Sequence, residues 1–122
     1  MLTFRFSPDG PLPAHAPTKY PELLQTEGTF DILINGRRFF SDPYFPIYEF
    51  LLQANEWMAS EAAPDIMEYS SLETDENPLL CFRKTEAGNY SLQSPWESFE
   101  NSATFSFAEI REAINGLNRM MK

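Results

Sequence analysis

The sequence lacks several features on which whole classes of protein depend. A single cysteine, Cys81, excludes an internal disulfide and a zinc site built from several cysteines. No apolar run approaches the roughly 18 residues that a membrane-spanning helix needs. Residues 1–8 contain no apolar segment of the length found in signal peptides. We therefore expect a cytoplasmic protein that does not contact membranes.

Recognised catalytic patterns are missing as well. The five glycines do not cluster into a phosphate-binding loop, and neither a G-x-S-x-G turn nor an H-E-x-x-H helix occurs. The lone histidine, His15, has no second histidine or cysteine nearby with which to bind a metal. Cys81 lies in an apolar strand, which is typical of a buried and inert thiol, although Arg83 shares its strand face. We predict no catalytic residue, no metal and no cofactor.

Positive charge is scarce. Nine basic residues stand against eighteen acidic ones, which gives a net charge of −9 and a pI near 4.5. Such a charge repels nucleic-acid backbones and anionic membranes, and it attracts basic partners. The basic pair Arg37 and Arg38 follows a hairpin turn, where it offsets neighbouring acids. The sequence therefore predicts no nucleic-acid binding. A negative surface that only maintains solubility is the alternative.

Local patterns in the first third predict strands. Residues 2–6 alternate apolar and polar side chains, as a half-buried strand does. Residues 7–19 are rich in proline and predict an extended loop. The β-forming runs 29–34 and 37–40 flank an Asn-Gly pair at 35–36, the strongest short-range signal for a tight hairpin.

A helix is predicted next. Its entry is placed at Ser41 or Asp42 as the N-cap, with Pro43 or Pro46 in the first turn and an end near Ala62. Its apolar stripe consists of Ile47, Phe50, Leu51, Ala54, Trp57 and Met58. Its opposite, solvent-facing stripe is predicted to consist of Glu49, Gln53, Glu56 and Ser60.

The second half predicts a three-stranded antiparallel meander and a final helix. Strands are expected over 65–70, 79–83 and 90–94, with connections too short for a crossover, and a short strand near 104–105. Ser106 to Glu109 form the S-x-x-E pattern of a helix start. We predict that residues 1–122 form one α+β domain, with an antiparallel sheet of about five or six strands and two helices packed on it.

Acidic and aromatic residues are interleaved over 65–100. Acidic groups around an aromatic anchor are typical of surfaces that steer and then bind a protein partner. The same pattern also fits a solvated acidic face with Trp96 and Phe99 in the core. The predicted partner-binding residues are Asp65, Glu68, Tyr69, Glu73, Asp75, Glu76, Trp96, Glu97 and Glu100.

The chain resembles the small acidic immunity proteins of bacterial polymorphic-toxin and contact-dependent inhibition systems. The resemblance covers the general layout: the hairpin over 32–40, a helix ending in Asn55-Glu56-Trp57, the strand 90–94 and a capped C-terminal helix. It implies a non-enzymatic inhibitor of a toxin domain, often a nuclease, and it carries over no functional residue. We expect such a protein to be a monomer or weak homodimer with one basic protein partner.

Two other functions fit the same composition. One is an adaptor or regulatory subunit of a housekeeping complex. The other is a small hydrolase that uses a carboxylate pair, for which Asp65 with Glu68 and Asp75 with Glu76 are the nearest candidates. Such a pair needs one desolvated carboxyl group, whereas both candidates lie in turn-like or edge-like sequence.

Overall fold

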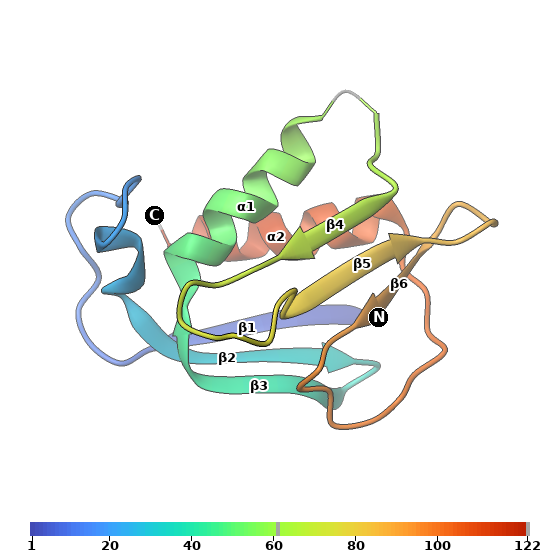
Figure 1. Ribbon diagram of the computed structural model, residues 1–122, viewed down its shortest axis with the longest axis horizontal. Helices are drawn as coiled ribbons and strands as arrows, with labels where there is room; N and C mark the ends of the chain where they lie inside the picture. Colours follow the sequence, from blue (N-terminus) through green and yellow to red (C-terminus); the bar gives the residue numbers. More distant parts are fainter. Residues whose placement is uncertain (61, 122) are drawn as a thin grey trace.

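The computed structural model describes residues 1–60 and 62–121, and its first sheet follows the predicted hairpin. Strands β1 (Leu2–Pro8), β2 (Glu27–Ile34) and β3 (Arg37–Pro46) pair antiparallel in the order β1-β2-β3 (Figure 1). Asn35 and Gly36 have φ values of 52° and 83°, which a two-residue hairpin turn requires. The hairpin is therefore confirmed. Because β1 extends through Pro8, the proline-rich loop begins two residues later than predicted.

The predicted meander forms a second sheet. Strands β4 (Ile66–Tyr69), β5 (Leu80–Lys84) and β6 (Tyr90–Gln93) pair antiparallel in that order, and Tyr90 forms an isolated bridge with Phe105. The fold is α+β, but the six strands of the described residues divide into two three-stranded sheets instead of one sheet of five or six. Another segment contacts the outer edge of β3, where the Ser98 N–H donates to the Phe39 carbonyl at 2.8 Å.

Within the described residues, two α-helices and one short 3₁₀ helix complete the fold: η1 (Glu22–Leu24), α1 (Ile47–Ala59) and α2 (Phe107–Met120). The start of α2 is as predicted, because the Ser106 hydroxyl accepts a hydrogen bond from the Glu109 N–H at 3.0 Å. No helix in the described part of the chain has the length and apolar character needed to cross a membrane.

The predicted entry of the first helix is wrong. β3 continues through Pro46, and α1 begins at Ile47 without a side-chain cap. The carboxylate of Asp42 accepts a hydrogen bond from the Tyr44 N–H at 2.9 Å within the strand. Proline is tolerated there because β3 is an edge strand with a register shift opposite residues 28–30. The helix also ends at Ala59, earlier than predicted.

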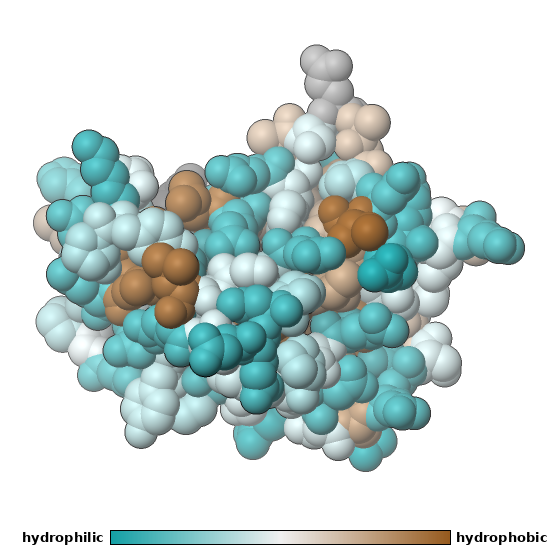
Figure 2. Space-filling view, in the orientation of Figure 1, coloured by the Kyte–Doolittle hydropathy of each residue, from teal (hydrophilic) through white to brown (hydrophobic). Residues whose placement is uncertain are grey.

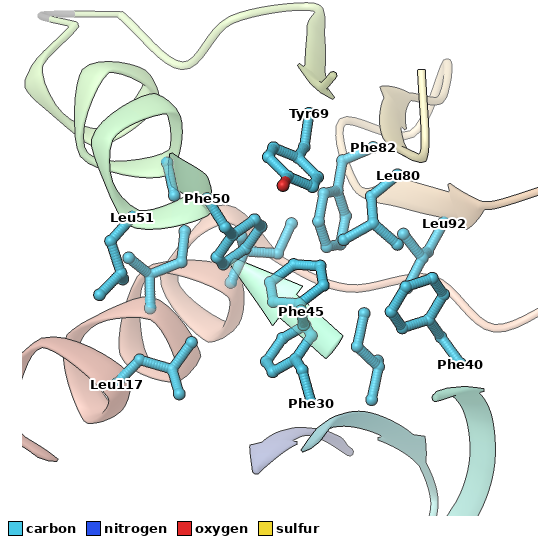
Figure 3. Close-up of a cluster of buried hydrophobic side chains, with 14 of the residues drawn as sticks. Phe30, Phe40, Phe45, Phe50, Leu51, Tyr69, Leu80, Phe82, Leu92 and Leu117 are labelled. Carbon is cyan, nitrogen blue, oxygen red and sulfur yellow. The ribbon is translucent and has the colours of Figure 1, made fainter. Parts of the chain in front are cut away.

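Aromatic side chains fill the space between the two sheets and the helices. Phe30 and Phe45 stack with their ring centroids 4.4 Å apart, and Phe50 of α1 lies 5.5 Å from Phe30. Figure 3 shows Tyr69 and Phe82 from the second sheet reaching the same cluster from the other side. The core thus joins both sheets to α1, and it fixes which face of the second sheet points outward.

One residue of α1 has the opposite environment from the one predicted. Helical periodicity predicts that Glu49 faces solvent, yet none of its surface is exposed. Its carboxylate accepts hydrogen bonds from the hydroxyls of Tyr20 and Tyr69, both at 2.7 Å, and from the Leu72 N–H at 3.2 Å. These three donors come from other segments that wrap the start of α1, so helical periodicity alone could not reveal the burial.

Candidate functional site

The outer face of the second sheet carries a row of polar side chains. Alternation along the strands turns Met67 and Phe82 into the core and leaves Glu68, Cys81 and Gln93 on the opposite face. Glu68 pairs with Cys81, and Cys81 pairs with Gln93, so the three side chains lie side by side across β4, β5 and β6. This row forms the floor of a hollow of about 660 Å³.

The segment 94–101 forms the wall of this hollow, which we call the larger hollow because a second, smaller one lies near Trp96. A turn holds it in place, since the Ser94 hydroxyl accepts a hydrogen bond from the Trp96 N–H at 3.1 Å. The Ser94 N–H in turn donates to the Glu97 carboxylate at 3.1 Å. Glu97 and Glu100 both line the hollow. Figure 2 shows the face that carries this sheet as mostly hydrophilic, with separate hydrophobic patches.

The charges in the larger hollow are unbalanced. Among the described residues that line it, three are carboxylates (Glu68, Glu97 and Glu100) and one, Arg83, is a cation. Burial raises the pKa of the Cys81 thiol, and the neighbouring Glu68 raises it further. The thiol is therefore protonated at neutral pH, which opposes a nucleophilic role for it. The arrangement favours binding of a basic side chain.

Trp96 lies beside the larger hollow with 36% of its surface exposed. Its ring stacks on Phe40, with centroids 6.2 Å apart and planes 9° from parallel, and its indole N–H donates to the Glu76 carboxylate. A smaller hollow of about 200 Å³ is lined by Trp96 together with Asp42, Tyr44 and Glu73. An exposed aromatic ring thus lines one acidic hollow and lies next to another.

Two carboxyl groups of the smaller hollow have raised pKa values. Desolvation raises the pKa of Asp42, and the Tyr44 N–H only partly offsets the effect. Desolvation also raises the pKa of Glu73, and the carboxylates of Glu27 and Glu49 raise it further. A cation supplied from outside would relieve the repulsion between Glu73 and these carboxylates. We call Glu68, Glu97, Glu100, Trp96, Asp42 and Glu73 the acidic surface.

The structure brings together some of the predicted partner-binding residues and separates others. Five belong to the acidic surface: Glu68, Glu73, Trp96, Glu97 and Glu100. Glu76 joins them through its hydrogen bond to Trp96. Asp65 lies just before β4 and does not line the larger hollow; its carboxylate is 3.9 Å from the Lys84 ammonium. Asp75 is exposed on the loop after β4 and lines neither hollow.

Tyr69 does not fit the predicted surface. It is fully buried and its hydroxyl donates to Glu49, so it offers no contact to a partner. Sequence reasoning also missed Asp42 and Tyr44, because it assigned them to a helix entry instead of a strand. The sequence indicates Arg83 only as a neighbour of Cys81, and the alternation that places both side chains on one strand face is the signal that points to it.

The fold and the site together define an α+β domain with two three-stranded sheets and an open acidic surface. Within residues 1–60 and 62–121, no three Asp, Glu, His or Cys side chains are arranged to hold a metal ion. The chain belongs to the family described as Domain of unknown function (DUF7878), whose family model matches residues 2–122. No curated protein and no solved structure matches the chain.

Proposed function

We propose that this domain is a non-enzymatic binding module whose acidic surface binds one basic protein, and that it acts as an immunity protein against a toxin domain. The observation that carries the proposal is the group of carboxylates around two adjacent hollows with Arg83 as the one lining cation among the described residues. The raised pKa of Glu73 supports it, because nearby carboxylates add to the effect of desolvation at that side chain. The resemblance to immunity proteins supplies the toxin as the partner class.

Binding would proceed in two physical steps. The negative surface attracts a basic partner over a distance and raises the association rate by roughly 10–10³-fold at low salt. Contact then desolvates the exposed face of Trp96, which provides an anchor of the kind found at interface centres. Basic side chains of the partner enter the larger hollow and contact Glu68, Glu97 or Glu100. A toxin that uses those same basic groups to hold an anionic substrate is thereby inhibited.

The test compares two triple variants with the same change of charge. The first carries Glu68→Lys, Glu97→Lys and Glu100→Lys in the acidic surface. The matched control carries Glu22→Lys, Glu56→Lys and Glu86→Lys, which are exposed and line neither hollow. Each tagged protein is incubated with its native lysate at low and high salt, and captured proteins are identified by mass spectrometry. We expect one basic protein in near-stoichiometric amount with the wild type and the control, and its loss with the first variant.

A second measurement separates the two candidate roles. The captured protein is expressed alone and together with the domain, and growth is followed. Growth arrest that the wild type and the control relieve, and the acidic-surface variant does not, supports the immunity role. Capture of a harmless housekeeping complex supports the adaptor alternative instead. Equal capture by both triple variants would show that the acidic surface is not the binding site.

A further inference from the structure

The outer edge of β1 carries backbone groups without partners. In an antiparallel pair, the N–H and C=O groups of successive residues point alternately toward and away from the neighbouring strand. The Met1 C=O accepts from the Asn35 N–H at 2.8 Å, and the Asp9 N–H donates to the Glu27 C=O at 3.0 Å, so odd-numbered residues point toward β2.

The even-numbered residues of β1 therefore point away from the sheet. Leu2 confirms this, because its N–H donates to the Glu109 carboxylate at the start of α2, at 2.8 Å. By the same alternation, the N–H and C=O groups of Phe4 and Phe6 lie on the open edge. β1 pairs only with β2 in the described chain, and no other described group forms a hydrogen bond with these four backbone groups. They form a short template for one further strand.

A groove lies between this edge and the second half of α2. It has a volume of about 480 Å³, and Figure 1 shows β1 at the end of its sheet with α2 running alongside. Met120 is 44% exposed there, so an apolar side chain is available for contact. We call it the β1–α2 groove, and the lining residues used below are Phe4, Arg5, Phe6, Gly116, Leu117 and Met120.

Gly116 is the unusual residue of this groove. Glycine inside a helix costs about 1 kcal/mol relative to alanine, so it needs a reason. A Cβ built at Gly116 would meet only the Arg119 guanidinium, at an ordinary 3.9 Å. Packing among the described residues therefore does not require glycine there. Its effect is to keep open the space next to the β1 edge.

We propose that the β1–α2 groove binds an extended peptide segment of a protein partner, which adds to β1 as a fourth strand and carries an apolar–acidic–apolar sequence. The central residue of such a strand pairs with Arg5 and lies on the same sheet face. Arg5 forms no ion pair with a carboxylate within 4.0 Å among the described residues. Asp31, opposite Arg5 on β2, also lines the groove and lies 3.8 Å from Arg38. An acidic residue at this position supplies the missing charge.

The flanking residues of the segment define the apolar part of the sequence. They pair with Phe4 and Phe6 and point toward the helix side, where they contact Leu117 and Met120. A second copy of this chain fits less well, because in the register centred on Arg5 its own Arg5 would lie opposite and repel. The groove shares no residue with the acidic surface, so this proposal does not depend on the proposed function.

The test uses the whole chain and a fluorescein-labelled peptide, Ser-Thr-Val-Asp-Val-Thr-Ser, with fluorescence anisotropy as the readout. A second peptide has lysine in place of aspartate, and a third has N-methylated backbone amides on the edge that would face β1. We expect the aspartate peptide to bind about tenfold more tightly than the lysine peptide. The N-methylated peptide should not bind, because it cannot form the strand hydrogen bonds.

Two variants keep the test separate from simple unfolding. Gly116→Ala should weaken peptide binding while the melting temperature stays equal or rises, since alanine favours the helix. Arg5→Glu should reverse the preference, so that the lysine peptide binds better than the aspartate peptide. Equal binding of both peptides to the wild type, or full binding to Gly116→Ala, would overturn the proposal. So would a stable dimer in sedimentation experiments that Arg5→Glu disrupts, because the groove would then belong to a second copy.

Discussion

Glu49 is a carboxylate placed in the core with neutral donors around it. Its three hydrogen bonds come from Tyr20, Tyr69 and the Leu72 N–H. A hydrogen bond to a charged group is worth more than a neutral one, and a buried carboxylate that loses a donor pays the cost of desolvation. Glu49 therefore holds the segment before β2 and the loop after β4 against the start of α1.

Removing one phenol hydroxyl at a time should give unequal losses. Tyr69→Phe is expected to lower the free energy of unfolding by about 2 kcal/mol, because the hydroxyl is buried and water cannot replace it. Tyr20→Phe should cost less than about 1 kcal/mol, because Tyr20 is 43% exposed and water can take over the hydrogen bond. Urea denaturation of both variants at pH 7 measures the difference. Equal losses would mean that the two hydroxyls are equally accessible to water.

The same site predicts a loss of stability in alkali. Burial and the hydrogen bond to Glu49 raise the pKa of Tyr20 to about 12, from an ordinary value of 10.0. Because the folded pKa lies above the unfolded one, the stabilisation is fully present below pH 10 and is lost as the pH rises through 12. Ultraviolet titration of the tyrosinate band in the wild type and in Tyr20→Phe locates this ionisation.

Replacing Glu73 should raise the stability of the fold, whereas the changes at Tyr20 and Tyr69 lower it. Desolvation and nearby carboxylates raise its pKa above 4.5 in the folded protein, so its charged form destabilises the fold at neutral pH. Glu73→Gln should therefore stabilise the protein at pH 7, by less than about 1 kcal/mol because the side chain is exposed. The gain should shrink as the pH falls below the folded pKa and vanish well below 4.5, where Glu73 is protonated in both states. A thermal denaturation series from pH 3 to pH 7 tests this.

At the scale of the elements, β1 and β2 approach each other closely at Gly28. A Cβ at Gly28 would lie 2.2 Å from the Ser7 carbonyl oxygen and 2.7 Å from the Pro8 Cα, both of them backbone atoms. Gly28→Ala should therefore cost about 1–3 kcal/mol of stability. Gly10→Ala is the matched control, because nothing lies within 4 Å of a Cβ there, and it should change stability by less than about 0.5 kcal/mol. A large effect in the control would point to a general effect of alanine in this region.

Elements whose start depends on local chemistry were predictable from the sequence. Asn35-Gly36 supplies the backbone angles of a hairpin, and Ser106 supplies the acceptor that a helix start needs. The segment 41–46 was misassigned because its prolines fit both a helix entry and a bulged edge strand. Only the pairing with β2, which is a long-range interaction, separates these two possibilities.

The candidate site was predictable only in part, because its geometry also depends on contacts between segments that are distant in the sequence. The acidic and aromatic composition of 65–100 pointed to the correct region. The register that sets Glu68 beside Cys81, and the path that brings Glu97 and Glu100 over them, depend on contacts between distant segments. Tyr69 differs from Glu68 by one position and lies on the opposite face, so a small error in strand phase exchanges a core residue for a surface residue.

Because the whole molecule is strongly negative, salt should stabilise the fold and weaken binding to a basic partner. With a net charge of −9, the carboxylates repel one another in the compact state. Raising NaCl from low to physiological concentration should increase stability by less than about 1 kcal/mol, because salt screens this repulsion. The same salt should weaken association with a basic partner. Calorimetric melting and binding kinetics in one salt series measure both, and a melting temperature that falls with salt would contradict the first effect.

The contact between β1 and α2 also constrains when the protein can fold. β1 leaves the ribosome before α2, yet Ile110, Ile114 and Leu117 of α2 are buried in a core that β1 shares. Until residues 107–120 emerge, the first sheet keeps part of its apolar face uncovered. Native packing is therefore completed only after residues 107–120 have emerged, and the nascent chain passes through a stage in which exposed phenylalanines can bind chaperones or other nascent chains.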